Sequence, residues 1–170
     1  MRTCHPKSES KLEVAYQGPV YSKGFFSVPV ESIDTYQQLR TAFLTRSIAP
    51  LGLLYGPRQF GKTTIAHRLW TSLAEDPSVL AMYLSIIPLD VKTEKDFWLA
   101  LSRTIDEETT SFEEFQDMIQ RSGKRLWLAI DKMDAMFKNE ELTSNFMQYL
   151  LSWQSSQSFL GFLELGAVTC

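Results

Sequence analysis

One segment of eight residues constrains this chain more than any other part of its sequence, and it reads Gly56-Pro57-Arg58-Gln59-Phe60-Gly61-Lys62-Thr63. It fits the pattern G-x-x-x-x-G-K-[ST] at every fixed position. The apolar run at residues 51–55 predicts a short buried strand before it, and residues 63–75 predict a helix after it. In a glycine-rich loop between a strand and a helix, backbone N–H groups and the helix dipole converge on an anion. The segment therefore predicts a phosphate-binding loop.

The fixed residues of this loop have separate chemical roles. The glycines let the backbone turn around a phosphate, Lys62 provides a positive charge for the outer phosphates, and the hydroxyl of Thr63 can bind Mg²⁺. An ordinary glycine turn with a solvated lysine would not require the strand, the spacing and the helix to agree. We therefore predict a nucleoside triphosphate site with the binding residues Gly56, Pro57, Arg58, Gln59, Phe60, Gly61, Lys62, Thr63 and Thr64.

A second informative segment ends in an aspartate. Residues 125–130 are almost continuously apolar and predict a buried strand, and Asp131 follows at its carboxyl end. Ligands of open parallel sheets bind at that end of the strands. A carboxylate there can hold the Mg²⁺ that Thr63 contacts, although an exposed aspartate that caps the next helix would look the same. We predict Thr63 and Asp131 as metal ligands, and Lys62 and Asp131 as the catalytic residues.

The rest of the chain alternates between helical and extended patterns. Residues 32–44 predict a helix before the phosphate loop, and residues 79–86 predict a buried strand after it. Two short helices with aromatic core residues follow, and residues 111–114 form a capping box at the start of the second. This alternation predicts an α/β fold in three layers, with a mostly parallel sheet and helices on both of its faces.

Composition limits the domain organisation and the partners. With 170 residues, of which 44% are hydrophobic, the chain can bury one core, so we expect a flexible tail at residues 1–18 and one nucleotide-binding domain at residues 19–170. The formal net charge is -3 and the basic residues are scattered, which does not indicate nucleic-acid binding.

The cysteines and histidines suggest no further site. Cys4 and Cys170 lie at opposite ends of the chain, so no disulfide framework or zinc spacing can be recognised. His5 and His67 are expected to be solvated or structural. No signal peptide or membrane-spanning run of about 20 apolar residues is present, and we predict a cytoplasmic protein.

Two segments together carry a family resemblance. Residues 56–64, with residues 128–136 (Leu-Ala-Ile-Asp-Lys-Met-Asp-Ala-Met), resemble the Walker A and Walker B segments of AAA-like ATPases. The resemblance extends over about residues 32–167, and more narrowly the chain resembles the ATPase domains of crinkler-type effector proteins of fungi and oomycetes. It implies a P-loop NTPase fold that binds Mg²⁺ and ATP.

The chain departs from the resembled family directly after Asp131. These ATPases usually have a glutamate there, which polarises the attacking water, whereas this chain has Lys132. A lysine ammonium cannot accept a proton from water at neutral pH. Asp134 could substitute, but the family more often uses an aspartate at that position structurally. We therefore expect nucleotide binding with weak or absent hydrolysis.

The resemblance also implies a sensor strand between the two motif strands. Residues 159–165 are the candidate, with Glu164 or Thr169 as the polar sensor residue. In the resembled fold a further strand, an arginine finger and a helical lid follow, and we expect this chain to lack them. The strand at residues 51–55 should then lie at a sheet edge, open to self-association or a protein partner, unless residues 12–16 cover it.

Two alternative functions remain open. Asp131-Lys132-Met133-Asp134 is one residue away from the guanine-reading pattern N-K-x-D, so a GTPase that reads guanine through Asp134 is the first. No aspartate between Asp76 and Asp117 has a glycine three residues later, as a GTPase switch requires, so we prefer ATP. The second is a non-catalytic interaction module that uses the nucleotide as a structural ligand.

Overall fold

Four parallel strands form the centre of the fold in a computed structural model, which describes residues 29–45, 48–57, 59–86 and 91–167. The strand order in the sheet is β1-β4-β3-β2. The strands are β1 (Leu51–Gly56), β2 (Val79–Ser85), β3 (Arg125–Asp131) and β4 (Phe159–Ala167). All neighbouring pairs run parallel, so the carboxyl ends of the strands meet at one edge of the sheet.

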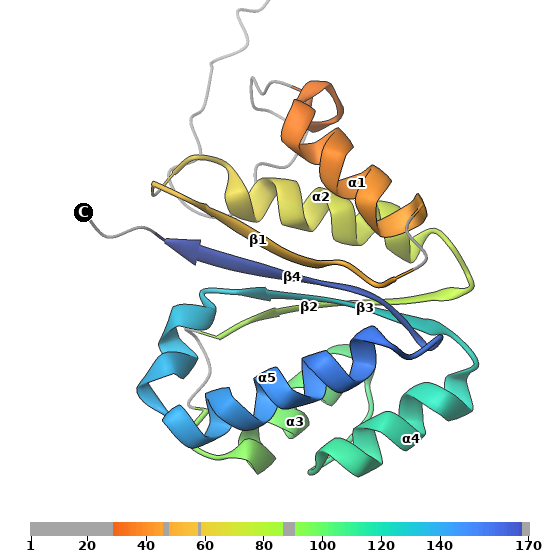
Figure 1. Cartoon of the computed structure of the whole chain (residues 1–170), viewed down its shortest axis with the longest axis vertical. Coiled ribbons are helices and arrows are strands. Elements are labelled where there is room, and N and C mark those ends of the chain that lie inside the picture. The colour runs from red at the N-terminus through yellow and green to blue at the C-terminus, as the bar shows by residue number, and fades with distance from the viewer. Residues whose placement is uncertain (1–28, 46–47, 58, 87–90, 168–170) are drawn as a thin grey trace, which may run out of the picture.

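Helices cover both faces of this sheet (Figure 1). One face carries the short 3₁₀ helix η1 (Val30–Ser32), α1 (Asp34–Thr45) and α2 (Lys62–Ala74). The other carries α3 (Glu94–Ser102), α4 (Phe112–Ser122) and α5 (Glu140–Gln154), with the 3₁₀ helices η2 (Arg103–Ile105) and η3 (Met133–Lys138) in the connections. The predicted α/β three-layer fold with a mostly parallel sheet is confirmed.

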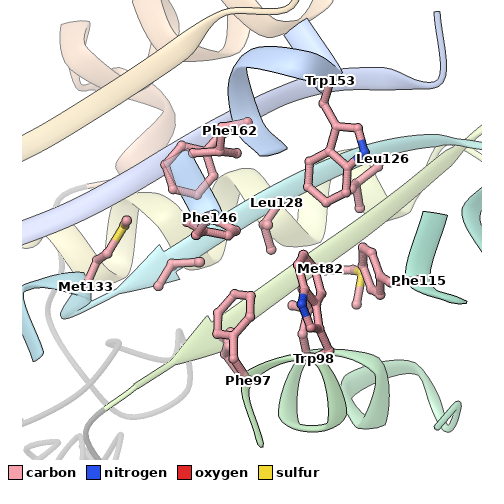
Figure 2. Packing of buried hydrophobic residues seen from close by; sticks show 14 of the residues in the cluster. Met82, Phe97, Trp98, Phe115, Leu126, Leu128, Met133, Phe146, Trp153 and Phe162 are labelled. Atoms are coloured by element: carbon pink, nitrogen blue, oxygen red, sulfur yellow. The ribbon is translucent and has the colours of Figure 1, made fainter. Parts of the chain in front are cut away.

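Each helical layer packs on the sheet through its own hydrophobic cluster. Between the sheet and α3, α4 and α5 the cluster is rich in aromatic side chains (Figure 2), and its members include Met82, Phe97, Trp98, Phe115, Leu126, Leu128, Met133, Phe146, Trp153 and Phe162. The opposite cluster, under α1 and α2, includes Phe43, Ile65, Leu69, Trp127 and Leu163. Alternate residues of β3 enter the two clusters, as expected for a central strand that is covered on both faces.

Side-chain caps fix where the helices of the aromatic layer begin. Thr93 accepts a hydrogen bond from the backbone N–H of Asp96 at 3.2 Å, and the Asp96 carboxylate accepts one from the N–H of Thr93 at 3.0 Å, which is a full capping box. Ser111 caps α4 by accepting from the N–H of Glu114 at 3.3 Å. The Glu114 carboxylate also accepts from the backbone N–H of Thr110 at 2.7 Å, one residue before the cap.

The predicted elements are present with ends shifted by at most about two residues, which is the usual uncertainty of helix and strand boundaries. The exception is α5, which the sequence interpretation left out. Its buried residues Leu142, Phe146, Leu150 and Trp153 are spaced as one face of a helix, so the signal was available.

Gly161 lets β4 pass close to α1. A Cβ atom at this position would lie 2.4 Å from Cδ1 of the buried Phe43 ring and 3.0 Å from the carbonyl oxygen of Pro50. The backbone also has φ +159° there, and the pairing of β4 with β3 shifts register between Leu126 and Trp127. Only a residue without a side chain fits this crossing.

Strand β1 lies at the edge of the sheet formed by the described residues, as predicted. It pairs with β4 on one side, and its alternate side chains Leu51, Leu53 and Tyr55 are 39%, 57% and 68% exposed. Residues 12–16, the segment whose coverage of this edge would prevent self-association, and the tail at residues 1–18 lie outside the described residues, so both stay predictions. Among the described helices, none has the length and apolar character needed to cross a membrane.

Candidate functional site

The loop between β1 and α2 has the backbone shape that its glycines allow. Gly56 has φ 153° and Gly61 has φ 76°, and a Cβ atom added to either would meet nothing within 4 Å. Gln59 is also held at φ 64°, which is unusual for a residue with a side chain. Phe60 is 74% exposed beside it. The described part of the loop therefore leaves its backbone open to a ligand. Arg58 lies outside the described residues.

Lys62 is folded back over this loop. Its Nζ atom donates hydrogen bonds to the carbonyl oxygens of Gly56 and Pro57, each at 2.7 Å. An ammonium group has three donors, so these two bonds hold the positive charge within the curve of the loop. A phosphate that entered the loop would meet this charge directly.

No side chain caps the N-terminus of α2, whereas side chains cap the helices α3, α4 and α5 that follow it. Its N-cap residue is Gly61, with no side-chain hydrogen bond, and its first turn has no acidic residue. In contrast, α3, α4 and α5 each begin with a side-chain cap and acidic residues in the first turn. The first N–H groups of a helix need acceptors and the helix dipole favours an anion, so this end of α2 is suited to an anionic ligand.

The structure brings Thr63 and Asp131 together from 68 positions apart. The Thr63 hydroxyl donates a hydrogen bond to Oδ2 of Asp131 at 3.0 Å, and Asp131 is only 6% exposed. The Tyr83 hydroxyl donates to the same oxygen at 2.8 Å. Tyr83 was missed in the sequence interpretation, because its contact depends on how β2 and β3 align in space.

These residues fit a magnesium ion bound together with a phosphate. A hydroxyl that donates to a carboxylate keeps its oxygen lone pairs, so Thr63 can accept a cation while it bonds to Asp131. Within the described part of the chain, no group of three or more His, Cys, Asp or Glu residues could hold a metal alone. Mg²⁺ usually binds through one or two protein groups plus waters and substrate phosphates, which matches this pair.

Lys132 follows Asp131 in a left-handed backbone conformation, with φ 61°. Its backbone N–H donates to the carbonyl oxygen of Leu165 at 3.0 Å, and its side chain is exposed. The position where the resembled ATPases have a glutamate is therefore a solvated cation. Asp134 is also exposed, in η3.

Glu164, one of the two sensor candidates, lies on the wrong face of the sheet for that role. It is paired in register with Ile130, whose side chain belongs to the aromatic layer, whereas Asp131 contacts Thr63 of α2. Burial raises the pKa of Glu164, and the negative charge of Asp134 raises it further. The other candidate, Thr169, lies outside the described residues.

His67 contributes packing behind the site. Its ring lies edge-on to Trp70 with 5.0 Å between centroids, and 6.2 Å from the ring of Tyr83. Burial lowers the pKa of His67. The Trp70 indole N–H donates to the carbonyl oxygen of Ala81 at 3.0 Å, which fixes this aromatic group on β2.

A separate surface depression of about 680 Å³ lies beside α4. Helix α4 covers the opposite face of the sheet from α2 (Figure 1). Three of its six lining residues are acidic, the full set being Glu108, Thr109, Glu114, Asp117, Gln120 and Arg121. Such a lining repels a triphosphate, so the loop before α2 is the better nucleotide site.

The parallel sheet, the glycine loop and the α2 N-terminus define an α/β protein with the P-loop NTPase fold. The family model described as an AAA domain matches residues 45–163, and the chain belongs to this family. This confirms the AAA-like part of the sequence resemblance. A comparison with curated protein sequences gives no significant match.

Solved structures with this fold include two archaeal proteins. The ORC2 protein of Aeropyrum pernix, solved as ADPNP–ADP complexes, superposes with a TM-score of 0.59 at 13% identity, over 78% of this chain and 40% of that chain. A Walker-type ATPase of Pyrococcus abyssi gives a TM-score of 0.59 at 14% identity, over 89% of this chain and 48% of that chain. This chain therefore spans less than half the length of either protein, and the likeness shows the fold alone.

A third neighbour bears on nucleic acid. Drosophila ORC, solved bound to AT-rich DNA and Cdc6, gives a TM-score of 0.53 at 17% identity, over 80% of this chain and 24% of that chain. That DNA complex belongs to the fly protein. The expectation that this chain does not bind nucleic acid stays a prediction, as does its narrower resemblance to crinkler-type ATPase domains.

Proposed function

We propose that this chain binds Mg²⁺–ATP in the loop between β1 and α2 and hydrolyses it weakly or not at all. The observation that supports this most is the 3.0 Å hydrogen bond between Thr63 and Asp131, which joins the start of α2 to the carboxyl end of β3. The two residues that the sequence predicts as metal ligands thus meet at the loop. An ordinary glycine turn would give no reason for this meeting.

The residues of the loop would divide the work of holding the nucleotide. The Lys62 ammonium exchanges its two carbonyl acceptors, Gly56 and Pro57, for phosphate oxygens, which bind a cation more strongly than neutral carbonyls do. The N-terminal N–H groups of α2 would donate hydrogen bonds to further phosphate oxygens. Thr63 and Asp131 would hold Mg²⁺, which neutralises phosphate charge.

Weak hydrolysis follows from the residue after Asp131. A positioned general base contributes about 10²–10⁴-fold to the rate of such a reaction. Lys132 is an exposed cation in that position and cannot serve as one. We therefore propose that nucleotide binding, more than turnover, is the function of the described domain, which leaves the non-catalytic interaction module as a variant of the same proposal.

The position of Asp131 argues against the GTPase alternative. A guanine-reading N-K-x-D motif needs its first side chain near the base, whereas Asp131 is almost fully buried and bonded to Thr63 and Tyr83. Its carboxylate is thus directed to the phosphate end of the site. This favours ATP over GTP.

A nucleotide titration of the purified chain tests these statements together. ATP and GTP would each be titrated with Mg²⁺ and with EDTA, and bound nucleotide measured by calorimetry. We expect ATP to bind at least as tightly as GTP and to bind more tightly with Mg²⁺. Absence of nucleotide binding would reject the proposal, and a clear preference for GTP would reverse the choice of base.

A further inference from the structure

We propose that Tyr83 is a positioning residue that orients the Asp131 carboxylate for Mg²⁺, an inference that rests on the function proposed above. Tyr83 belongs to β2, which contributes no residue to the loop or to the predicted metal pair. Its hydroxyl nevertheless lies 2.8 Å from Oδ2 of Asp131. It therefore contacts the one carboxylate that the proposed metal site requires.

Two hydroxyls converge on one oxygen of this carboxylate. Thr63 donates to Oδ2 at 3.0 Å from the α2 side, and Tyr83 donates to the same Oδ2 from β2. An ionised carboxylate only accepts hydrogen bonds, so two donors on one oxygen fix the rotation of the group. Both of these bonds end on Oδ2, and the fixed rotation therefore also fixes the direction of the second oxygen, Oδ1.

The Tyr83 hydroxyl is held in place by the packing of its ring. The ring lies 6.2 Å from both Trp70 and His67, and the Trp70 indole is anchored by its 3.0 Å bond to the Ala81 carbonyl. Parallel pairing aligns Tyr83 with Ala129, two residues before Asp131 on the same face of the sheet. The long tyrosine side chain spans this offset, so the hydroxyl position is set by β2, β3 and α2 together.

This arrangement matters for metal binding because Thr63 alone cannot fix the carboxylate. If Thr63 binds a cation through its hydroxyl oxygen, the cation restricts the direction in which the same hydroxyl can donate its hydrogen bond to Asp131. Tyr83 is not one of the predicted metal ligands, so its bond to Asp131 would remain available when Thr63 binds the cation. Outer hydrogen bonds to metal ligands of this kind typically contribute 10- to 100-fold in metal affinity.

The test is the Tyr83→Phe substitution in the full chain, which removes the hydroxyl and keeps the ring. ATP affinity would be measured with Mg²⁺ and with EDTA, and urea unfolding would verify the fold. We expect the gain in ATP affinity that Mg²⁺ produces to fall by about tenfold or more, while affinity in EDTA stays unchanged. The matched control is Tyr55→Phe, because Tyr55 is an exposed tyrosine of β1 that should leave both affinities unchanged.

A double-mutant cycle separates positioning from a general structural effect. If Tyr83 acts through Asp131, Tyr83→Phe should have no further effect on the Mg²⁺-dependent gain in the Asp131→Asn background. An equal loss of ATP affinity with Mg²⁺ and with EDTA, or a full effect in the Asp131→Asn background, would overturn the inference. So would an unchanged Mg²⁺ dependence in Tyr83→Phe. A parent chain that binds no nucleotide at all would instead reject the proposed function.

Discussion

The ammonium group of Lys62 lies 2.7 Å from the carbonyl oxygen of Gly56, so the lysine of the phosphate loop is bonded to the residue that opens the same loop. These hydrogen bonds thus hold the Lys62 ammonium at the place where phosphates would enter the loop. A ligand has to compete with two backbone carbonyls for this charge, which a phosphate can do because its hydrogen bonds are assisted by full charges.

Lys62→Ala should abolish or greatly weaken ATP binding and leave the fold intact, since the side chain contacts only loop carbonyls among the hydrogen bonds of the described residues. Calorimetric titration with Mg²⁺–ATP measures the loss, and urea unfolding verifies the fold. Lys138→Ala, at an exposed lysine of η3, is the control and should bind like the parent chain. A folded Lys62→Ala protein with parental affinity would contradict the phosphate-loop interpretation.

Lys132→Glu should raise ATP turnover, because it restores a carboxylate next to Asp131. A general base contributes about 10²–10⁴-fold, whereas an arginine finger contributes about 10³–10⁵-fold in related reactions. We therefore expect a partial gain in steady-state phosphate release at saturating Mg²⁺–ATP. Lys132→Gln, which removes the charge without adding a carboxylate, should show no gain. Brisk turnover by the parent chain, with no improvement in the mutant, would show that Lys132 is no defect.

Glu164→Gln should raise the free energy of unfolding at pH 7. Burial and the charge of Asp134 raise the pKa of Glu164 in the folded chain above its ordinary value. Between the ordinary glutamate pKa of 4.5 and the raised pKa of folded Glu164, the folded state binds more protons than the unfolded state. The free energy of unfolding therefore falls as the pH rises through this window. Urea unfolding at pH 7 and at pH 4 should show a gain at pH 7 that shrinks at pH 4. The same substitution at the exposed Glu107 is the matched control.

Gly161→Ala should destabilise the fold by about 1–3 kcal/mol or more, because overpacking of a well-packed site costs that much. The added Cβ would overlap the buried Phe43 ring at 2.4 Å. Gly166→Ala on the same strand is the matched control, since its Cβ would meet nothing within 4 Å. Chemical denaturation of both variants measures the difference, and equal stabilities would show that α1 can move away from β4 without cost.

The exposed edge of β1 should make the purified chain self-associate as its concentration rises. Leu53→Lys places a charge in the middle of the edge strand and should shift the equilibrium to monomer in sedimentation experiments. Leu151→Lys, at a similarly exposed leucine of α5, should not. A stable monomer in which the amides of residues 12–16 exchange as fast as those of a free peptide would contradict both self-association and coverage by this segment.

The unit of β1, loop and α2 could be predicted from the sequence because each of its signals is local. The strand run, the glycines and the helix after Lys62 all lie within a short stretch of chain. Asp131 could be placed at a strand end for the same reason. Its partner Tyr83 could not be predicted, because that contact depends on the pairing of β2 with β3. The face of the sheet on which Glu164 lies could not be predicted for a similar reason, because it follows from the register in which β4 pairs with β3.

The strand order also determines when the site can exist. Among the described residues β1 pairs with β4, so the first strand joins the sheet only through the last one. During synthesis, the loop before α2 and the Asp131 strand are both made before the strand that lies between them. We therefore expect a nascent chain that ends before Phe159 to leave ATP unbound, so that ATP binding reports the insertion of β4 between β1 and β3.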